Sequence, residues 1–334
     1  MEKILNRSKL VNPSIAPRFI PLLATAFVLI LLYGTGCLRY RNFGSARVLV
    51  DLLGDNAFLG VAAVGTTFVI LSGGIDLSVG AVLAFTSTLI ASLVEHHGAP
   101  PLAAIAIALA VGAAFGASMG ALIHNFQLPP FLVTLSGMFF ARSMAFVLEP
   151  KSLSLKDPFY MQTLSQNLNL PLPGGLSLPF IALCCLLFFA LGAWSLGKTR
   201  FGRTVYALGG DEEAARFMGL RVARTKVGVY ALSGFCSASA GVLYGIYTGS
   251  GDPTTGVGFE LDAIAAVVIG GTLLTGGVGS LGGTAMGVLI LGLIQTLISF
   301  QGNLDSFWTR IVIGVLVLLF LLLQRVTSPG EVDN

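Results

Sequence analysis

Charged residues are scarce in this sequence. Lys, Arg, Asp and Glu together make up 10% of its 334 residues, whereas 54% of the residues are hydrophobic. This balance excludes an ordinary water-soluble core and indicates an all-α chain that crosses a lipid bilayer many times. The formal net charge of +3 is also too small to suggest a nucleic-acid partner. Membrane lipid is therefore the expected surrounding.

Cysteine and histidine are rare as well. The four cysteines lie in or at the ends of apolar segments, without the spacing of metal ligands, so we interpret them as packing residues. His96, His97 and His124 have no carboxylate or thiol companions at ligand spacing. We therefore predict no metal site.

Apolar segments of membrane-spanning length occur throughout the chain, which we expect to form one transmembrane domain over residues 1–334. A cleaved signal peptide is the alternative for the first segment, but its apolar run is too long and no small-x-small cleavage site follows. About ten transmembrane helices are predicted. They lie near residues 19–36, 48–71, 75–94, 102–124, 128–148, 178–196, 226–248, 259–273, 276–298 and 308–324.

The basic residues predict the orientation of these spans. Four of the nineteen Lys and Arg residues precede the first span, and seven lie between Lys198 and Lys226. With ten spans both regions fall on one side, which the positive-inside rule makes cytoplasmic, together with both termini. Arg39, Arg41 and Arg47 oppose this assignment, although acidic residues lie nearby. Residues 149–177 then form the main loop on the outer side.

One stretch occurs twice. Residues 59–87, LGVAAVGTTFVILSGGIDLSVGAVLAFTS, contain a break at Gly73-Gly74 and return 203 residues later with a break at Gly276-Gly277. Seven of nineteen aligned positions are identical. These matches indicate an internal repeat of about residues 19–124 and 222–327, and a repeated broken helix is typical of a transport pathway. The span count favours a parallel repeat, but one misplaced span would make the repeat inverted.

Residues 197–225 form the predicted cytoplasmic loop. Gly209-Gly210 is predicted to be a turn, Asp211 an N-cap, and Gly219 a C-cap. Between these caps the sequence predicts a two-turn amphipathic helix. It is either an ordinary loop helix or a docking element for a cytoplasmic partner, and Phe217 and Met218 favour docking because little of the chain would cover them.

Three segments of the chain are distinctive: LSGGIDLSVG at 71–80, GRTVYALGGDEEAARFMGL at 202–220 and ELDAIAAVVIGGTLLTGGVGSLGGT at 260–284. Together they resemble the permease subunits of bacterial ABC sugar importers of the ribose, xylose, arabinose and galactose type. The similarity runs in order through nearly the whole chain. Within the family the chain most resembles a permease of a galactofuranose importer, through residues 55–80. Related permeases commonly carry Asn where this chain has Asp211, and both residues can cap a helix.

The resemblance implies a type II importer-like permease that moves a sugar across the inner membrane by alternating access. It implies three partners: an ABC ATPase subunit that binds ATP and Mg²⁺, a periplasmic sugar-binding protein, and a second, similar permease. No cofactor is expected in this chain, and it is not expected to be an enzyme. The implied coupling helix that contacts the ATPase comprises Asp211, Glu212, Glu213, Ala214, Ala215, Arg216, Phe217, Met218 and Gly219.

A phosphate-binding pattern occurs beside the loop, since residues 192–199 match G-x-x-x-x-G-K-[ST]. The pattern needs a preceding strand and a following helix, whereas here it ends an apolar span. We therefore interpret Lys198 as a positive-inside anchor and expect ATP to bind the partner.

Polar residues within the spans are candidates for contact with the solute. They are Asn56, Thr66, Ser72, Asp76, Glu260, Asp262 and Gln295. Asp76 either occupies the first turn of a helix or lines the exit or a subunit contact. Asn56, Glu260 and Asp262 either form an outer vestibule or cap helices and dock the delivery protein. Thr66 and Gln295 either meet the solute or bond neighbouring helices.

An ion-driven secondary transporter of a small neutral solute is the alternative function. It would require paired ionisable groups at mid-membrane, and the sequence shows no such pair. A channel or a structural membrane protein would leave the helix at 211–219 without a purpose.

Overall fold

The computed structural model describes residues 20–302 and 307–327. The first half contains α1 (Ile20–Arg39), α2 (Ala46–Asp55), α3 (Ala57–Leu71), α4 (Val79–Glu95), α5 (Pro101–Asn125), α6 (Pro130–Leu148), β1 (Leu153–Ser154), η2 (Phe159–Asn167), β2 (Leu170–Leu172) and β3 (Leu176–Leu178). The second half contains α7 (Phe180–Lys198), α8 (Arg200–Gly210), α9 (Glu212–Phe217), α10 (Val222–Thr248), β4 (Ser250–Gly251), α11 (Phe259–Ile269), α12 (Leu281–Gln301) and α13 (Phe307–Thr327).

The helical membrane architecture is confirmed. Among the described residues, seven helices are long and apolar enough to span a membrane, and α2 with α3 makes an eighth span bent by 55°. The remaining two predicted spans contain shorter helices, α4 and α11. The count of ten is therefore approximate, because the chain is extended or looped at 72–78 and 270–280. Irregular backbone at membrane depth is tolerated where protein buries it.

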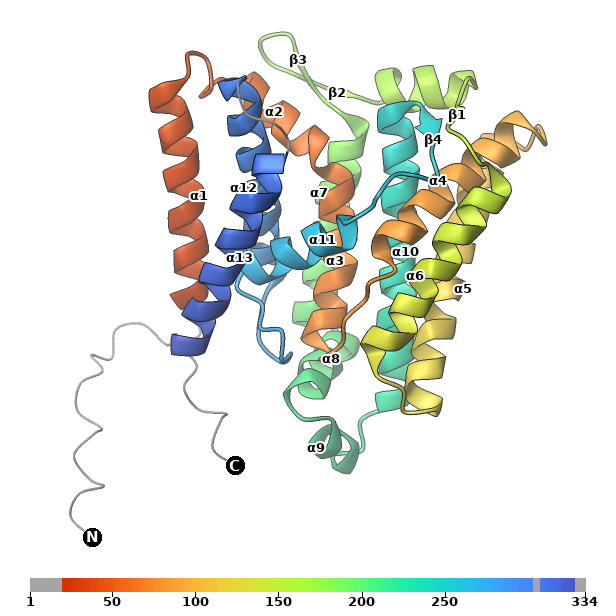
Figure 1. Ribbon diagram of the computed structural model, residues 1–334, viewed down its shortest axis with the longest axis vertical. Helices are drawn as coiled ribbons and strands as arrows, with labels where there is room; N and C mark the ends of the chain where they lie inside the picture. Colours follow the sequence, from red (N-terminus) through yellow and green to blue (C-terminus); the bar gives the residue numbers. More distant parts are fainter. Residues whose placement is uncertain (1–19, 303–306, 328–334) are drawn as a thin grey trace.

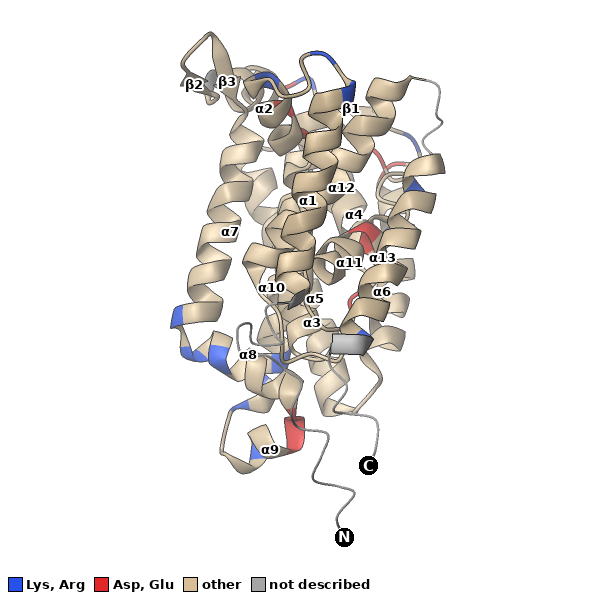
Figure 2. Cartoon of the chain, turned by 90° about the vertical axis from the view of Figure 1, so that its left-hand side faces the viewer, with Lys and Arg blue, Asp and Glu red and all other residues tan. Residues whose placement is uncertain are grey.

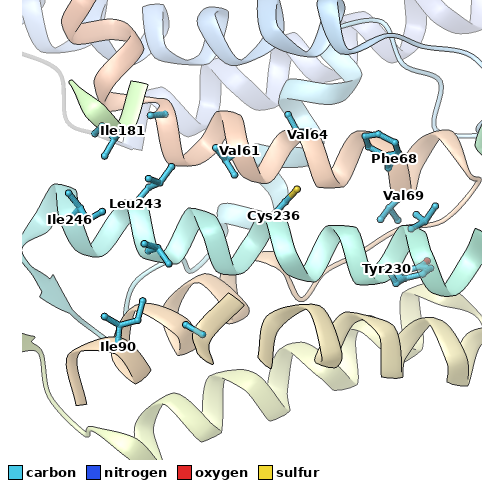
Figure 3. Packing of buried hydrophobic residues seen from close by; sticks show 14 of the residues in the cluster. Val61, Val64, Phe68, Val69, Ile90, Ile181, Tyr230, Cys236, Leu243 and Ile246 are labelled. Atoms are coloured by element: carbon cyan, nitrogen blue, oxygen red, sulfur yellow. The ribbon is translucent and has the colours of Figure 1, made fainter. Parts of the chain in front are cut away.

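Three helices form the centre of the molecule. α10 packs against both α3 and α4, α5 and α6 flank these helices on one side, and α1, α12 and α13 lie on the other (Figure 1). Between α3 and α10 lie the side chains of Val61, Val69, Cys236 and Leu243 (Figure 3). Every residue of α3 except the half-buried Phe58 is buried, which is why its sequence is apolar on all sides.

Glycines allow two helix pairs to approach closely. Gly112 and Gly116 of α5 face Gly234 of α10, where a β-carbon on any of them would overlap the opposing backbone or side chain. Gly283 and Gly287 of α12 are similarly tight against α11. Both of these glycine contacts are therefore packing surfaces, as small residues at four-residue spacing commonly are.

The two helix breaks meet one another. Gly277 N donates a hydrogen bond to Leu71 O over 3.0 Å, and Thr67 and Thr284 share a hydrogen bond of 2.9 Å between their hydroxyls. In the first stretch α3 leads toward α8 and α4 leads away, whereas α11 of the second stretch runs across the molecule before α12 leads away from the end that carries α8 (Figure 1). The directions of the first helices therefore differ between the two stretches. The repeat itself stays a prediction.

The first described helix begins, and the last described helix ends, at the same end of the molecule. Ile20 of α1 and Thr327 of α13 lie at the end that carries α8 and α9 (Figure 1). Lys and Arg gather around the adjoining end of α7, α8 and α9 (Figure 2). The four basic residues that precede the first span lie outside the described residues.

The loop at 149–179 lies at the opposite end. Its β1 pairs with β4, and its β2 and β3 form a hairpin. Within η2, Tyr160 donates a hydrogen bond of 3.0 Å to Pro101 O. Burial raises the pKa of the Tyr160 phenol above its usual value, so this phenol stays a neutral donor that fastens the loop to α5.

Candidate functional site

A short helix projects from the basic end of the molecule. α9 begins after Asp211, whose carboxylate accepts a hydrogen bond of 2.9 Å from Ala214 N, as an N-cap does. Gly219 follows the helix with φ at +76°, a conformation that glycine adopts at no steric cost. The predicted helix and both of its predicted caps are therefore present.

One face of α9 packs against the rest of the chain, and the other face is exposed. Ala215 is fully buried in a cluster with Leu208 and Val222. By contrast, Phe217 is 89% exposed and Met218 is 67% exposed. An aromatic side chain held out on a fixed helix at the basic end of the molecule is available to a partner.

The charged residues of α9 have different surroundings. Glu212 accepts a hydrogen bond from Lys226 of α10 and lies 3.7 Å from Arg216 in an ion pair. Glu212 therefore ties α9 to the start of α10. Glu213 lies in the first turn beside the N-cap, where the helix dipole favours negative charge.

The predicted turn at Gly209-Gly210 is wrong. Both residues belong to the last turn of α8, a helix over residues 200–210 that the sequence did not indicate. Gly209 is required because a β-carbon there would overlap the carbonyl oxygen of Leu71 and lie 2.5 Å from Gly277 N. Close backbone approach, rather than a turn, accounts for this glycine.

A polar cavity opens at the other end of the molecule. Its volume is about 810 Å³, and residues of α2, α3, α10, α11, α12 and α13 line it. Its polar lining comprises Asp51, Asp55, Asn56, Tyr247, Asp262, Gln295, Thr296, Ser299, Thr309 and Arg310. A space of this size, with hydrogen-bonding groups around it, is large enough for a small solute.

Three of the predicted pathway residues line this cavity. They are Asn56 at the α2–α3 bend, Asp262 in the first turn of α11, and Gln295 on α12. Asn56 donates a hydrogen bond to Leu52 O over 2.9 Å, which fixes its amide at the bend. Segments far apart in the sequence thus place their polar groups around one space.

The other predicted pathway residues lie elsewhere. Thr66 and Ser72 donate hydrogen bonds to Ala62 O and Val69 O of their own helix, so both bond within a helix. Glu260 is not in the cavity but faces the opposite way, toward Gly80 of α4. The predicted cluster of Asn56, Glu260 and Asp262 is therefore split by α11.

Asp76 does not occupy the first turn of a helix, because α4 begins three residues later at Val79. The residue is 1% exposed. Its carboxyl oxygens accept hydrogen bonds from Ser78 N, Ser78 Oγ and Ser233 Oγ at 2.9, 2.6 and 2.7 Å. Asp76 thus fastens the extended segment to α10 and does not line the cavity.

Several cavity residues were missed by sequence reasoning. Tyr247 donates a hydrogen bond to Asp55 Oδ1 over 3.1 Å, and Arg310 of α13 lines the same cavity as Asp262 of α11. The sequence showed no pair of ionisable groups in the spans because Asp262 and Arg310 are on different helices. The available signal was Asp262 in the first turn of α11 and Arg310 in the first turn of α13.

The segment that matches the phosphate-binding pattern is helical. Residues 192–198 complete α7, and Thr199 caps α8 by accepting a hydrogen bond of 3.1 Å from Gly202 N. No strand precedes the pattern within the described residues 180–198. This is not the strand, loop and helix arrangement that cradles phosphate.

Comparison with known proteins assigns the family. A family model described as branched-chain amino acid transport system / permease component matches residues 48–321. The chain belongs to this permease family. The permease is 47% identical over 308 residues to the inner membrane ABC transporter permease protein YjfF of Escherichia coli (strain K12), covering 92% of each chain.

Two other relatives carry the names of specific sugars. The permease is 42% identical to the ribose import permease protein RbsC of Bacillus subtilis (strain 168), over 84% of this chain and 85% of the relative. It is 38% identical to the fructose import permease protein FruG of Bifidobacterium longum (strain NCC 2705), over 92% and 91%. No solved structure matches the permease. The family and the membrane helices together identify the chain as a multi-pass transport subunit of an ABC importer.

Proposed function

We propose that this chain is the permease subunit of an ATP-driven importer that carries a monosaccharide, galactofuranose or a related sugar, across the bacterial inner membrane by alternating access. The observation that carries this proposal is the exposed Phe217 on an anchored helix at the basic end of the molecule. Relatives named for ribose and fructose import support a sugar as the solute.

An ABC ATPase subunit docks on α9 in this proposal. Docking requires an exposed apolar anchor on a helix that cannot swing away, and Phe217 on a helix held by Ala215 and Glu212 meets both requirements. The ATPase supplies the ATP and Mg²⁺ sites. In this proposal α9 and both termini lie in the cytoplasm, the side that the basic residues near α9 favour.

The periplasmic sugar-binding protein and a second, similar permease complete the importer. The cavity at the outer end then receives the sugar. Its carboxylates and amides, among them Asp55, Asn56, Asp262 and Gln295, suit hydroxyl groups because each can accept or share hydrogen bonds with them. Arg310 offsets part of the negative charge of Asp51, Asp55 and Asp262 in the lining.

The test of the proposal is co-elution of ATPase activity with the tagged permease from solubilised native membranes. We expect ATP hydrolysis in the same fractions, increased when the binding protein and its sugar are added. Permease fractions without ATP hydrolysis, from membranes that import the sugar, would refute it. The secondary-transporter alternative predicts that result.

Substituting Gln295 by alanine should weaken sugar import without disturbing the fold. Gln295 lines the cavity, and loss of one hydrogen bond to an uncharged solute costs about 0.5–1.5 kcal/mol, which corresponds to about a 2- to 12-fold higher half-saturating sugar concentration. The control is Ser136→Ala on α6, an exposed residue that bonds only Leu132 O of its own helix. Equal half-saturation for both variants would exclude Gln295 from the sugar path.

A further inference from the structure

The C-terminal end of α8 lies where the two helix breaks meet. A β-carbon at Gly209 would overlap Leu71 O at the end of α3 and would lie 2.5 Å from Gly277 N, in the loop before α12. These two atoms also bond each other, since Gly277 N donates to Leu71 O. One glycine of α8 therefore touches both breaks at the point where they are joined.

The contact is backbone against backbone from every side. A β-carbon at Gly276 would lie 2.8 Å from Gly73 N and 3.0 Å from Gly209 Cα, and one at Gly277 would lie 2.9 Å from Gly210 N. No side chain separates the three segments there. Since close-packed backbones have no rotamers that could absorb a shift, a displacement of one segment must move the other two.

A second contact ties α8 to the same loop. Tyr206, one turn before Gly209, donates a hydrogen bond to Gly279 O over 3.0 Å. The loop at 270–280 is thus held by α8 at two places. By contrast, Gly210 has open space where its β-carbon would lie.

α8 and α9 form one unit. Asp211 ends α8, since its N–H donates to Ala207 O over 3.1 Å, and the same residue caps α9. Leu208, Ala215 and Val222 pack together across the corner between the helices. A displacement of α9 is therefore transmitted to Gly209, because no flexible segment lies between them.

We propose that Gly209 is the positioning residue through which α9 moves both broken helices together. The inference rests on the proposed function, in which the ATPase docks on α9. The end of α3 and the loop before α12 both lie at this junction. A displacement of α8 therefore shifts both breaks in one step and opens or closes the inner end of the sugar path. Without the close contact at Gly209, ATP hydrolysis proceeds but no longer moves the sugar.

The experiment compares Gly209→Ala with Gly210→Ala in the complete importer, reconstituted in liposomes with its ATPase and binding protein. Three quantities are measured for each: the ATPase retained per permease, the ATP hydrolysed, and the radiolabelled D-galactose imported, with D-ribose and D-fructose as further probes. For Gly209→Ala we expect normal ATPase retention and at least about a fivefold fall in sugar imported per ATP hydrolysed. Gly210→Ala should match the wild type.

Sugar imported per ATP separates a positioning role from a structural one, because a merely packed glycine would change the amount of folded complex and not this ratio. A ratio for Gly209→Ala equal to that of Gly210→Ala would overturn the inference. If Gly209→Ala does not fold, the Tyr206→Phe variant replaces it, since this change removes only the hydroxyl that bonds Gly279 O. A lowered amount of sugar imported per ATP in Tyr206→Phe supports the inference, and an unchanged amount overturns it. Failure of the wild type to retain any ATPase would instead refute the proposed function, and the inference with it.

Discussion

The Phe217→Asp variant is expected to lose its ATPase subunit while keeping its fold. Phe217 is 89% exposed, so no contact within the chain depends on it. In a docked complex, however, its ring would be buried, and truncation of such an aromatic anchor commonly costs about 2 kcal/mol or more. A carboxylate buried in its place adds a desolvation penalty. The affinity for the ATPase should therefore fall by at least about thirtyfold.

The matched control for this variant is Leu38→Asp. Leu38 is 92% exposed and lies in the last turn of α1, at the opposite end of the molecule from α9. The Leu38→Asp variant therefore introduces the same negative charge at a place remote from α9. ATPase retained per permease is measured by quantitative gel analysis after affinity purification. Retention by Phe217→Asp equal to that of Leu38→Asp, in a folded protein, would show that α9 is not the docking site.

The Gly116→Leu variant is expected to lose its folded structure. A β-carbon at Gly116 would overlap Tyr230 O of α10 and lie 2.9 Å from the Tyr230 carbonyl carbon. Because both are backbone atoms, α5 and α10 would have to separate along their contact. Overpacking typically costs about 1–3 kcal/mol where side chains can yield, so a larger loss is expected here. That loss is a large part of the roughly 5–15 kcal/mol that stabilises a protein.

Gly314→Leu is the control for Gly116→Leu, since Gly314 of α13 has open space at its β-carbon. Both variants insert the same apolar side chain into a membrane helix. The measurement is the unfolding temperature in detergent, followed by size-exclusion chromatography of the heated sample. An unfolding temperature of Gly116→Leu equal to that of Gly314→Leu would contradict the packing described for α5 and α10.

The sequence allowed prediction of the features that depend on local chemistry. Long apolar runs located the membrane helices, paired glycines located the breaks, and Asp211 and Gly219 bounded α9. These predictions held because hydropathy and capping act within a few residues along the chain.

Features that depend on contacts between distant segments could not be predicted in the same way. Gly209 was assigned to a turn because paired glycines usually mark turns, whereas its actual role is set by Leu71 and Gly277. For Asp76 the sequence left two interpretations, the first turn of a helix or the lining of the exit or a subunit contact, and it could not show that Ser233 of α10 donates a hydrogen bond to this carboxylate. The cavity likewise joins Asp262 to Arg310 across two helices. Such partners become visible only when the helices are packed.

Sugar import by the reconstituted importer at a collapsed ion gradient tests the central proposal most directly. Liposomes containing the permease, its ATPase and a similar second permease are supplied with the binding protein, ATP and radiolabelled D-galactose, D-ribose or D-fructose, with an ionophore present throughout. We expect uptake of a sugar that requires ATP and every partner and is unaffected by the ionophore. Uptake by the permease alone that stops when the ionophore is added would contradict the proposal and establish ion-driven transport.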